Sequence, residues 1–184
     1  MKRAITLVMT VLLISTLLVG CDSKSGESSE NIKIGLNYEL SGNVATYGQS
    51  SVKGIEFAID EINKAGGVLG KQIELVKVDN KSDSAEAANV STKLATRDKV
   101  VVILGPATSG DAKAASPAAM QNKIPLISSS ATSDDFTVDS NGKVRDYIFR
   151  TCFNDSFQGI TMANFAFSDL KAKKAAILID NTSD

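Results

Sequence analysis

Two short loops dense in hydroxyl groups and backbone donors are the residues of this 184-residue sequence best suited to chemistry. They are residues 105–110 (GPATSG) and residues 128–133 (SSSATS), and each follows an apolar run. Free backbone N–H groups and hydroxyls at a helix N-terminus can hold an anion, with the helix dipole contributing about 0.3–1 kcal/mol. Serine and threonine also cap helices without any ligand, so the pattern alone leaves both roles open.

The anion that suits these loops is a small carboxylate rather than a nucleotide. No lysine follows the glycines of residues 105–110, as a phosphate-binding P-loop would require, and the first predicted strand lacks a G-x-G-x-x-G turn. Asp134 and Asp135 could form a metal pair, but a polar turn after a strand is the simpler interpretation. We therefore expect neither a metal nor a cofactor.

Composition argues against catalysis and against nucleic-acid binding. The chain has no histidine, which excludes a histidine-based hydrolytic triad and histidine-ligated metals within it. Its 20 basic and 21 acidic residues give a net charge of −1 and no field that would recruit nucleic acid. We expect a binding protein and not an enzyme, while an α/β enzyme remains the alternative from another class.

Apolar periodicity alternates between the periods of strands and helices, which predicts a doubly wound α/β fold with a parallel sheet. Ligands bind such sheets outside the carboxyl ends of the strands, which is where both loops fall. The run 100–104 (VVVIL) predicts a strand buried on both faces. The expected strands are 32–36, 73–78, 100–104, 125–129, 147–150 and 175–179. The expected helices are 52–65 ending at Gly66-Gly67, one starting at Asp83 with Glu86 three residues later, 110–121 interrupted by Pro117, and 156–170.

The N-terminus predicts export and lipid anchoring. Lys2-Arg3 precede an apolar stretch at residues 4–19, which is shorter than the roughly 20 residues that a transmembrane helix needs. A glycine stands directly before Cys21. This pattern resembles the lipobox of bacterial lipoproteins, with an ordinary signal peptide as the alternative. We expect a signal peptide at 1–20, a lipid on Cys21, a flexible tether over 21–31 and an extracytoplasmic, membrane-anchored protein. Cys152 is then the only other cysteine and is expected to be a small buried apolar residue.

Four segments, in order along residues 32–159, carry a family resemblance. They are IKIGLNYELSGNVATYGQSSVKGIEFAIDEINKAGGVLGKQIELVKVD, VVVILGPATSG, IPLISSSATS and IFRTCFNDSFQG. Together they resemble the N-terminal part of a leucine/isoleucine/valine-type periplasmic binding protein, the amino-acid receptor of an ABC importer. The resemblance implies a type I periplasmic-binding fold, with a first lobe at 32–151 and the start of a second at 152–184. It also implies an ABC permease as partner.

The same resemblance assigns roles to individual residues. Ser109 would bind the α-carboxylate of an amino acid through its hydroxyl and N–H, and Thr132 would give its N–H to that carboxylate and its hydroxyl to the α-ammonium. The carbonyl of Ser130 would accept from the ammonium, and Tyr47 would lie over the ligand side chain, with leucine, isoleucine or valine as the default ligand. The predicted ligand-binding residues are Tyr47, Thr108, Ser109, Ser130, Ala131 and Thr132.

By resemblance, further ligand contacts belong to a second lobe that lies largely beyond Asp184. We therefore expect the chain to be a fragment of a longer, two-lobed protein that clamps its ligand by lobe closure. A ligand-sensing module of the same fold is the alternative within this class.

Overall fold

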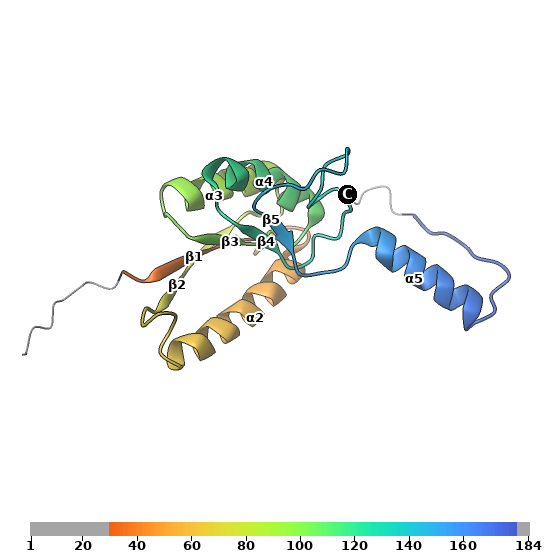
Figure 1. Ribbon diagram of the computed structural model, residues 1–184, viewed down its shortest axis with the longest axis horizontal. Coiled ribbons are helices and arrows are strands. Elements are labelled where there is room, and N and C mark those ends of the chain that lie inside the picture. The colour runs from red at the N-terminus through yellow and green to blue at the C-terminus, as the bar shows by residue number, and fades with distance from the viewer. Residues whose placement is uncertain (1–29, 180–184) are drawn as a thin grey trace, which may run out of the picture. The chain divides into compact units, whose positions relative to one another are not determined.

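The computed structural model describes residues 30–179, and they contain a five-stranded sheet in which every pairing is parallel (Figure 1). The spatial order of the strands is β2-β1-β3-β4-β5. From β1 the chain first adds β2 on one side and then β3, β4 and β5 on the other, so the direction of winding reverses between β1 and β3. This reversal is the topological switch point at which open α/β sheets bind ligands. The strands are β1 Ile32–Tyr38, β2 Ile73–Asp79, β3 Val102–Leu104, β4 Leu126–Ser128 and β5 Ile148–Arg150.

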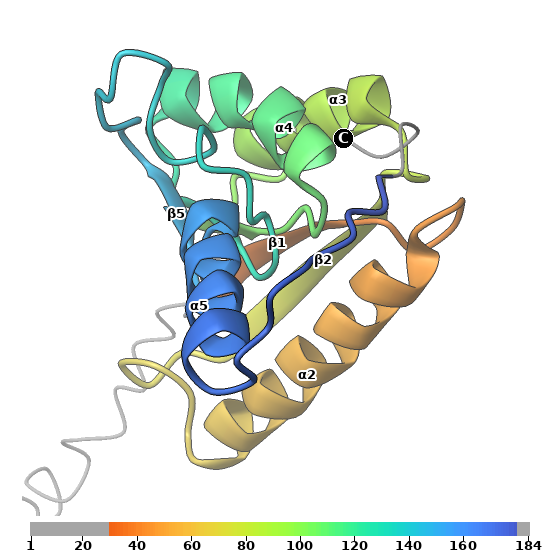
Figure 2. The same ribbon diagram turned by 90° about the vertical axis from the view of Figure 1, so that its right-hand side faces the viewer.

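Helices cover both faces of the sheet. In Figures 1 and 2, α3 and α4 lie together over one face, and α2 lies on the other. This arrangement confirms the predicted doubly wound α/β class. The helices are α2 Ala45–Lys64, α3 Ser84–Thr96, α4 Ser109–Asn122 and α5 Asp155–Ser168.

Strand β1 shows how alternation builds the two layers. Leu36 and Tyr38 belong to the apolar cluster on the α2 side, together with Val52 of that helix. Asn37 points the other way, where its amide donates to the backbone oxygen of Ala87 at 2.8 Å and to the Ser91 hydroxyl at 3.0 Å. The buried amide is therefore satisfied, and it fixes α3 against the sheet.

Two predicted helix ends are confirmed. The carboxylate of Asp83 accepts from the N–H of Glu86 at 2.7 Å and so caps α3. Gly67 has a φ of 77° and its N–H donates to the oxygen of Ile62 at 2.9 Å, which closes α2. The helix predicted over 110–121 is confirmed as α4, which continues through Pro117, and a kink at that proline stays a prediction. Proline removes one helical hydrogen bond, but several alanines of α4 are buried in the core and hold the helix in place.

The expectations for two strands are also corrected. The run 100–104 forms a strand only over Val102–Leu104, in which Ile103 is buried while Val102 and Leu104 are only partly buried. Val101, just before the strand, is 57% exposed. Residues 175–179 form no strand. A parallel strand needs a partner for its backbone groups, and the part of the chain that the structure describes offers none there.

The predicted signal peptide, the predicted lipidation site Cys21 and nearly all of the predicted tether lie outside the described residues. Within residues 30–179 no helix is both long and apolar enough to cross a membrane.

Candidate functional site

A cleft of about 490 Å³ opens at the carboxyl ends of the strands, a volume in the usual range for small-molecule sites. Its walls come from the loops and helix starts that follow β1, β2, β3 and β4. The lining residues are Asn43, Val44, Tyr47, Ser82, Ser84, Ala107, Thr108, Ser109, Asp111, Ser130 and Thr132.

The structure brings five of the six predicted site residues to this cleft: Tyr47, Thr108, Ser109, Ser130 and Thr132. Ala131 is fully buried, and its N–H donates to the Ser128 hydroxyl at 3.0 Å. The sequence reasoning missed the part of the wall that follows β2, although the rule of carboxyl strand ends applies to that loop as well. The missed residues of that loop and of the start of α3 are Ser82 and Ser84, and Asp111 in the first turn of α4 was also missed.

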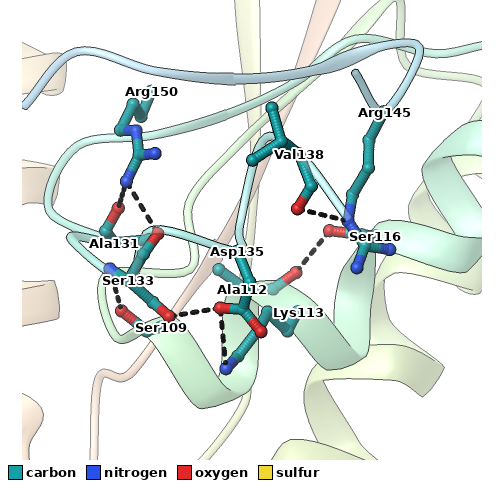
Figure 3. A network of polar contacts seen from close by, with 10 residues as sticks. All are labelled: Ser109, Ala112, Lys113, Ser116, Ala131, Ser133, Asp135, Val138, Arg145 and Arg150. Atoms are coloured by element: carbon teal, nitrogen blue, oxygen red, sulfur yellow. Dashed lines mark hydrogen bonds and ion pairs between the residues drawn. The ribbon is translucent and has the colours of Figure 1, made fainter. Parts of the chain in front are cut away.

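The N-terminus of α4 is open toward an anion. Thr108 occupies the N-cap position, but its side chain makes no capping hydrogen bond. Within residues 30–179, the backbone N–H groups of Ser109 and Gly110 have no acceptor. The Ser109 hydroxyl accepts from the N–H of Ser133 at 3.1 Å, as Figure 3 shows, so its own proton is available to a ligand. The helix dipole adds to the attraction for negative charge.

Arg150, at the end of β5, holds the loop 128–133 in place through its backbone oxygens. Its guanidinium donates to the backbone oxygens of Ala131 at 3.1 Å and Ser133 at 2.9 Å (Figure 3). The first bond orients the peptide group that carries the Thr132 N–H, and the second orients the peptide group that follows Ser133. The oxygen of Thr132, which lies between them in sequence, accepts from the N–H of Asp155 at 3.0 Å. The sequence reasoning did not identify Arg150, because nothing local to it indicates a partner 17 or 19 residues away.

Hydroxyl groups join the two loops to each other. The Ser128 hydroxyl donates to the oxygen of Pro106 at 2.6 Å, and the Ser130 hydroxyl donates to the oxygen of Ala107 at 2.8 Å. The serines of the second loop therefore serve partly as internal ties. Because the Ser130 side chain is engaged in this way, its backbone carbonyl is the group that it can offer to a ligand.

Other acidic and aromatic groups complete the site. Tyr47 stands in the first turn of α2 and is 61% exposed, so one side of the cleft is open. Asp111 is buried, and its carboxylate accepts from the Ser84 hydroxyl at 2.7 Å. Asp134 and Asp135 form a turn, as predicted. Among the residues that the structure describes, no three His, Cys, Asp or Glu side chains gather in a way that could hold a metal ion.

Asp79, the last residue of β2, fastens the loop that follows β1. Burial alone would raise the pKa of its carboxyl, but hydrogen bonds outweigh that effect and hold the pKa below its ordinary value of 3.8. The donors are the Ser41 hydroxyl and the N–H groups of Lys81, Leu40 and Ser41.

Replacing Asp79 with asparagine tests this clamp. Because the pKa of Asp79 is lower in the folded protein than its ordinary value of 3.8, its ionised carboxylate stabilises the fold fully above pH 3.8. This contribution to the free energy of unfolding is lost as the pH falls through the lowered pKa. We expect Asp79→Asn to lower the free energy of unfolding by about 1 kcal/mol at pH 7, with a smaller difference from wild type near pH 2. Thermal unfolding of the variant and of wild type between pH 2 and 7 measures the loss of stability at each pH. Asp146→Asn, at an exposed position, is the control. An equal loss at all pH values would contradict the clamp.

The chain is similar to a family of binding proteins and to proteins of ABC transporters. Residues 31–184 match the family described as periplasmic binding protein. The Leu/Ile/Val-binding protein BraC3 of Rhizobium johnstonii is 31% identical over 172 residues, which cover 94% of this chain and 46% of that protein.

Two solved structures share the fold. The branched-chain amino acid transporter substrate-binding protein LivJ of Streptococcus pneumoniae, in complex with isoleucine, is 51% identical with a TM-score of 0.72, covering 78% of this chain and 40% of that one. An ABC-transporter solute-binding protein of Rhodopseudomonas palustris, in complex with 3,4-dihydroxybenzoic acid, is 30% identical with a TM-score of 0.65, covering 74% and 36%.

The chain spans less than half the length of each of these relatives. The matched region includes the whole sheet and both loops of the cleft. The resemblance found in the sequence is therefore confirmed, and the chain belongs to the periplasmic binding protein family.

Proposed function

We propose that this chain forms the carboxylate-binding lobe of an extracytoplasmic receptor that delivers leucine, isoleucine or valine to an ABC permease. The observation that carries the proposal is the open N-terminus of α4, where free N–H groups and the Ser109 hydroxyl face a cleft that Thr132 also lines. The 51% identity to a protein solved with isoleucine supports the choice of ligand class.

In the proposed complex the ligand's α-carboxylate accepts from the N–H and hydroxyl of Ser109 and from the N–H of Thr132. The α-ammonium donates to the carbonyl of Ser130 and to the hydroxyl of Thr132. Tyr47 covers the aliphatic side chain and excludes water from it. These contacts read the groups common to all amino acids, so selection among side chains depends mainly on Tyr47 and on groups outside this lobe.

The apolar surface of α5 supports a second lobe. None of its residues is buried, although much of its surface is aromatic or aliphatic. Exposed apolar surface on this scale marks a surface that packs against protein. We propose that residues 32–151 belong to the first lobe and that 152–184 begin a second lobe, the rest of which packs on α5 and closes over the cleft. The exposed apolar residues of α5 are Phe157, Ile160, Met162, Phe165 and Phe167.

The proposed setting follows from the N-terminal pattern. Cleavage before Cys21 and lipidation of its thiol would hold the receptor at the outer face of the cell membrane, with residues 21–31 as a tether. Mass spectrometry of the mature protein from cells tests this: a diacylated N-terminal cysteine supports it, and a free cysteine or another N-terminus contradicts it.

Isothermal titration of the full-length mature protein tests the ligand. We expect saturable binding of leucine, isoleucine and valine, and recovery of each ligand unchanged after incubation. Binding of 3,4-dihydroxybenzoate but of no amino acid would still agree with a carboxylate-binding site and would show that the transported ligand is an aromatic acid. Turnover of a bound ligand would favour the enzyme alternative, and the absence of any amino-acid binding would contradict the proposed function.

A further inference from the structure

Glu39 is a buried carboxylate next to the cleft that none of the ligand contacts uses. It follows β1 directly, is fully buried, and does not line the cleft. The backbone around it is tightly packed, since a Cβ on Gly48 of α2 would lie 2.1 Å from the backbone oxygen of Glu39. The close approach of α2 therefore holds the backbone of Glu39 in place.

The Glu39 carboxylate binds the start of the loop that leads into α4. One oxygen accepts from the N–H of Ala107 at 3.0 Å. The other accepts from the N–H and from the hydroxyl of Thr108, both at 3.0 Å. All three donors belong to the two residues immediately before Ser109, and the bonds span 68 or 69 residues of sequence.

These bonds explain why the N-terminus of α4 is uncapped. A threonine at the N-cap normally accepts from the N–H two or three residues further on. Here the Thr108 hydroxyl is turned toward Glu39 and makes no capping bond. If it were released, it could cap its own helix and compete with a ligand for the same N–H groups.

We infer that Glu39 is a positioning residue for carboxylate recognition: it holds Ala107 and Thr108 so that the first N–H groups of α4 stay open to the ligand. This inference rests on the proposed function. Burial raises the pKa of the Glu39 carboxyl, and the hydrogen bonds from Thr108 and Ala107 oppose that shift. The carboxylate thus exchanges hydration for these donors, which is a structural cost that a purely space-filling side chain would not incur.

The negative charge of Glu39 and its hydrogen bonds to Ala107 and Thr108 have opposite effects on the affinity for a carboxylate. Substitutions of Glu39 can therefore distinguish the two. A negative charge near α4 disfavours a second anion there, so removing the charge alone would tighten carboxylate binding. Removing the hydrogen bonds weakens it instead. In Glu39→Gln the amide keeps one acceptor oxygen and presents N–H groups to one of the backbone donors. Glu39→Asp keeps the charge but is too short to hold both residues.

The experiment measures the affinity of the full-length mature protein for leucine and for leucinamide, which lacks the carboxylate charge. We expect Glu39→Gln and Glu39→Asp to bind leucine at least about tenfold more weakly, as loss of one charge-assisted hydrogen bond would cause, with a much smaller change for leucinamide. The exposed Glu74→Gln on β2 is the matched control and should bind both as wild type does. A merely structural role would weaken both ligands equally.

Amide exchange by NMR without ligand separates this inference from the proposed function. We expect the amides of Ala107 and Thr108 to exchange faster in both Glu39 variants, while that of Ile103 in β3 is unchanged. Faster exchange in a protein that binds no amino acid would contradict the proposed function and keep the positioning role. Unchanged exchange, or tighter leucine binding by Glu39→Gln, would overturn the inference.

Discussion

Replacing Gly105 with alanine is expected to destabilise the protein by about 4 kcal/mol or more and to abolish ligand binding. Gly105 connects β3 to the loop proposed to bind the ligand carboxylate, with a φ of +92°, a conformation that L-residues rarely adopt. An added Cβ would also lie 2.2 Å from the backbone oxygen of Asn37 and 2.9 Å from Cε2 of Tyr38. Because the nearest obstacle is backbone of the neighbouring strand, relief would require β1 and β3 to separate.

Gly54→Ala provides the matched control. Gly54 lies within α2, and a Cβ there would meet no heavy atom within 4 Å. We expect this variant to be as stable as wild type or more stable by about 0.5–1 kcal/mol, since alanine favours helices. Urea unfolding of both variants makes the comparison. A Gly105→Ala protein with wild-type stability and affinity would show that the loop does not need this backbone geometry.

Replacing Ser109 with alanine is expected to weaken leucine binding by roughly 10- to 100-fold, because a hydrogen bond to a charged group contributes about 1.5–3 kcal/mol. The side chain's other bond, accepted from the N–H of Ser133, would also be lost and would loosen the second loop. Isothermal titration measures the affinity, and thermal unfolding checks that the fold is intact.

Ser116→Ala is the control for that substitution. Ser116 belongs to the same helix and is buried, but its hydroxyl donates to the Ala112 oxygen of its own helix and does not line the cleft. It should bind leucine as wild type does. Equal affinity of the Ser109→Ala and Ser116→Ala proteins would contradict the placement of the ligand carboxylate at the start of α4.

The parts of this fold that follow from local pattern could be predicted from the sequence. The cap of α3 depends on Asp83 and Glu86, three residues apart, and the end of α2 on adjacent glycines, so each signal is contained in a few residues. The two hydroxyl-rich loops directly follow predicted parallel strands, so their position at the carboxyl ends of β3 and β4 could be predicted as well.

The parts of the fold and of the site that depend on residues distant in the sequence could not be predicted from it. Glu39 and Arg150 look like ordinary charged residues beside strands, and their roles appear only when the sheet brings them to loops far along the chain. The apolar run at 100–104 predicted burial on both faces, yet Val101 is exposed, because burial depends on which segments cover the sheet. Residues 175–179 have strand-like composition but no neighbouring strand to pair with among those described.

A crystal structure of the full-length mature protein with bound leucine would show directly whether the start of α4 binds the ligand carboxylate. We expect the leucine carboxylate to lie within about 2.7–3.2 Å of the backbone nitrogen and hydroxyl of Ser109 and the backbone nitrogen of Thr132. We also expect the Glu39 carboxylate to keep its hydrogen bonds from Ala107 and Thr108. Leucine bound elsewhere, or in this cleft with its carboxylate turned away from the start of α4, would contradict the account.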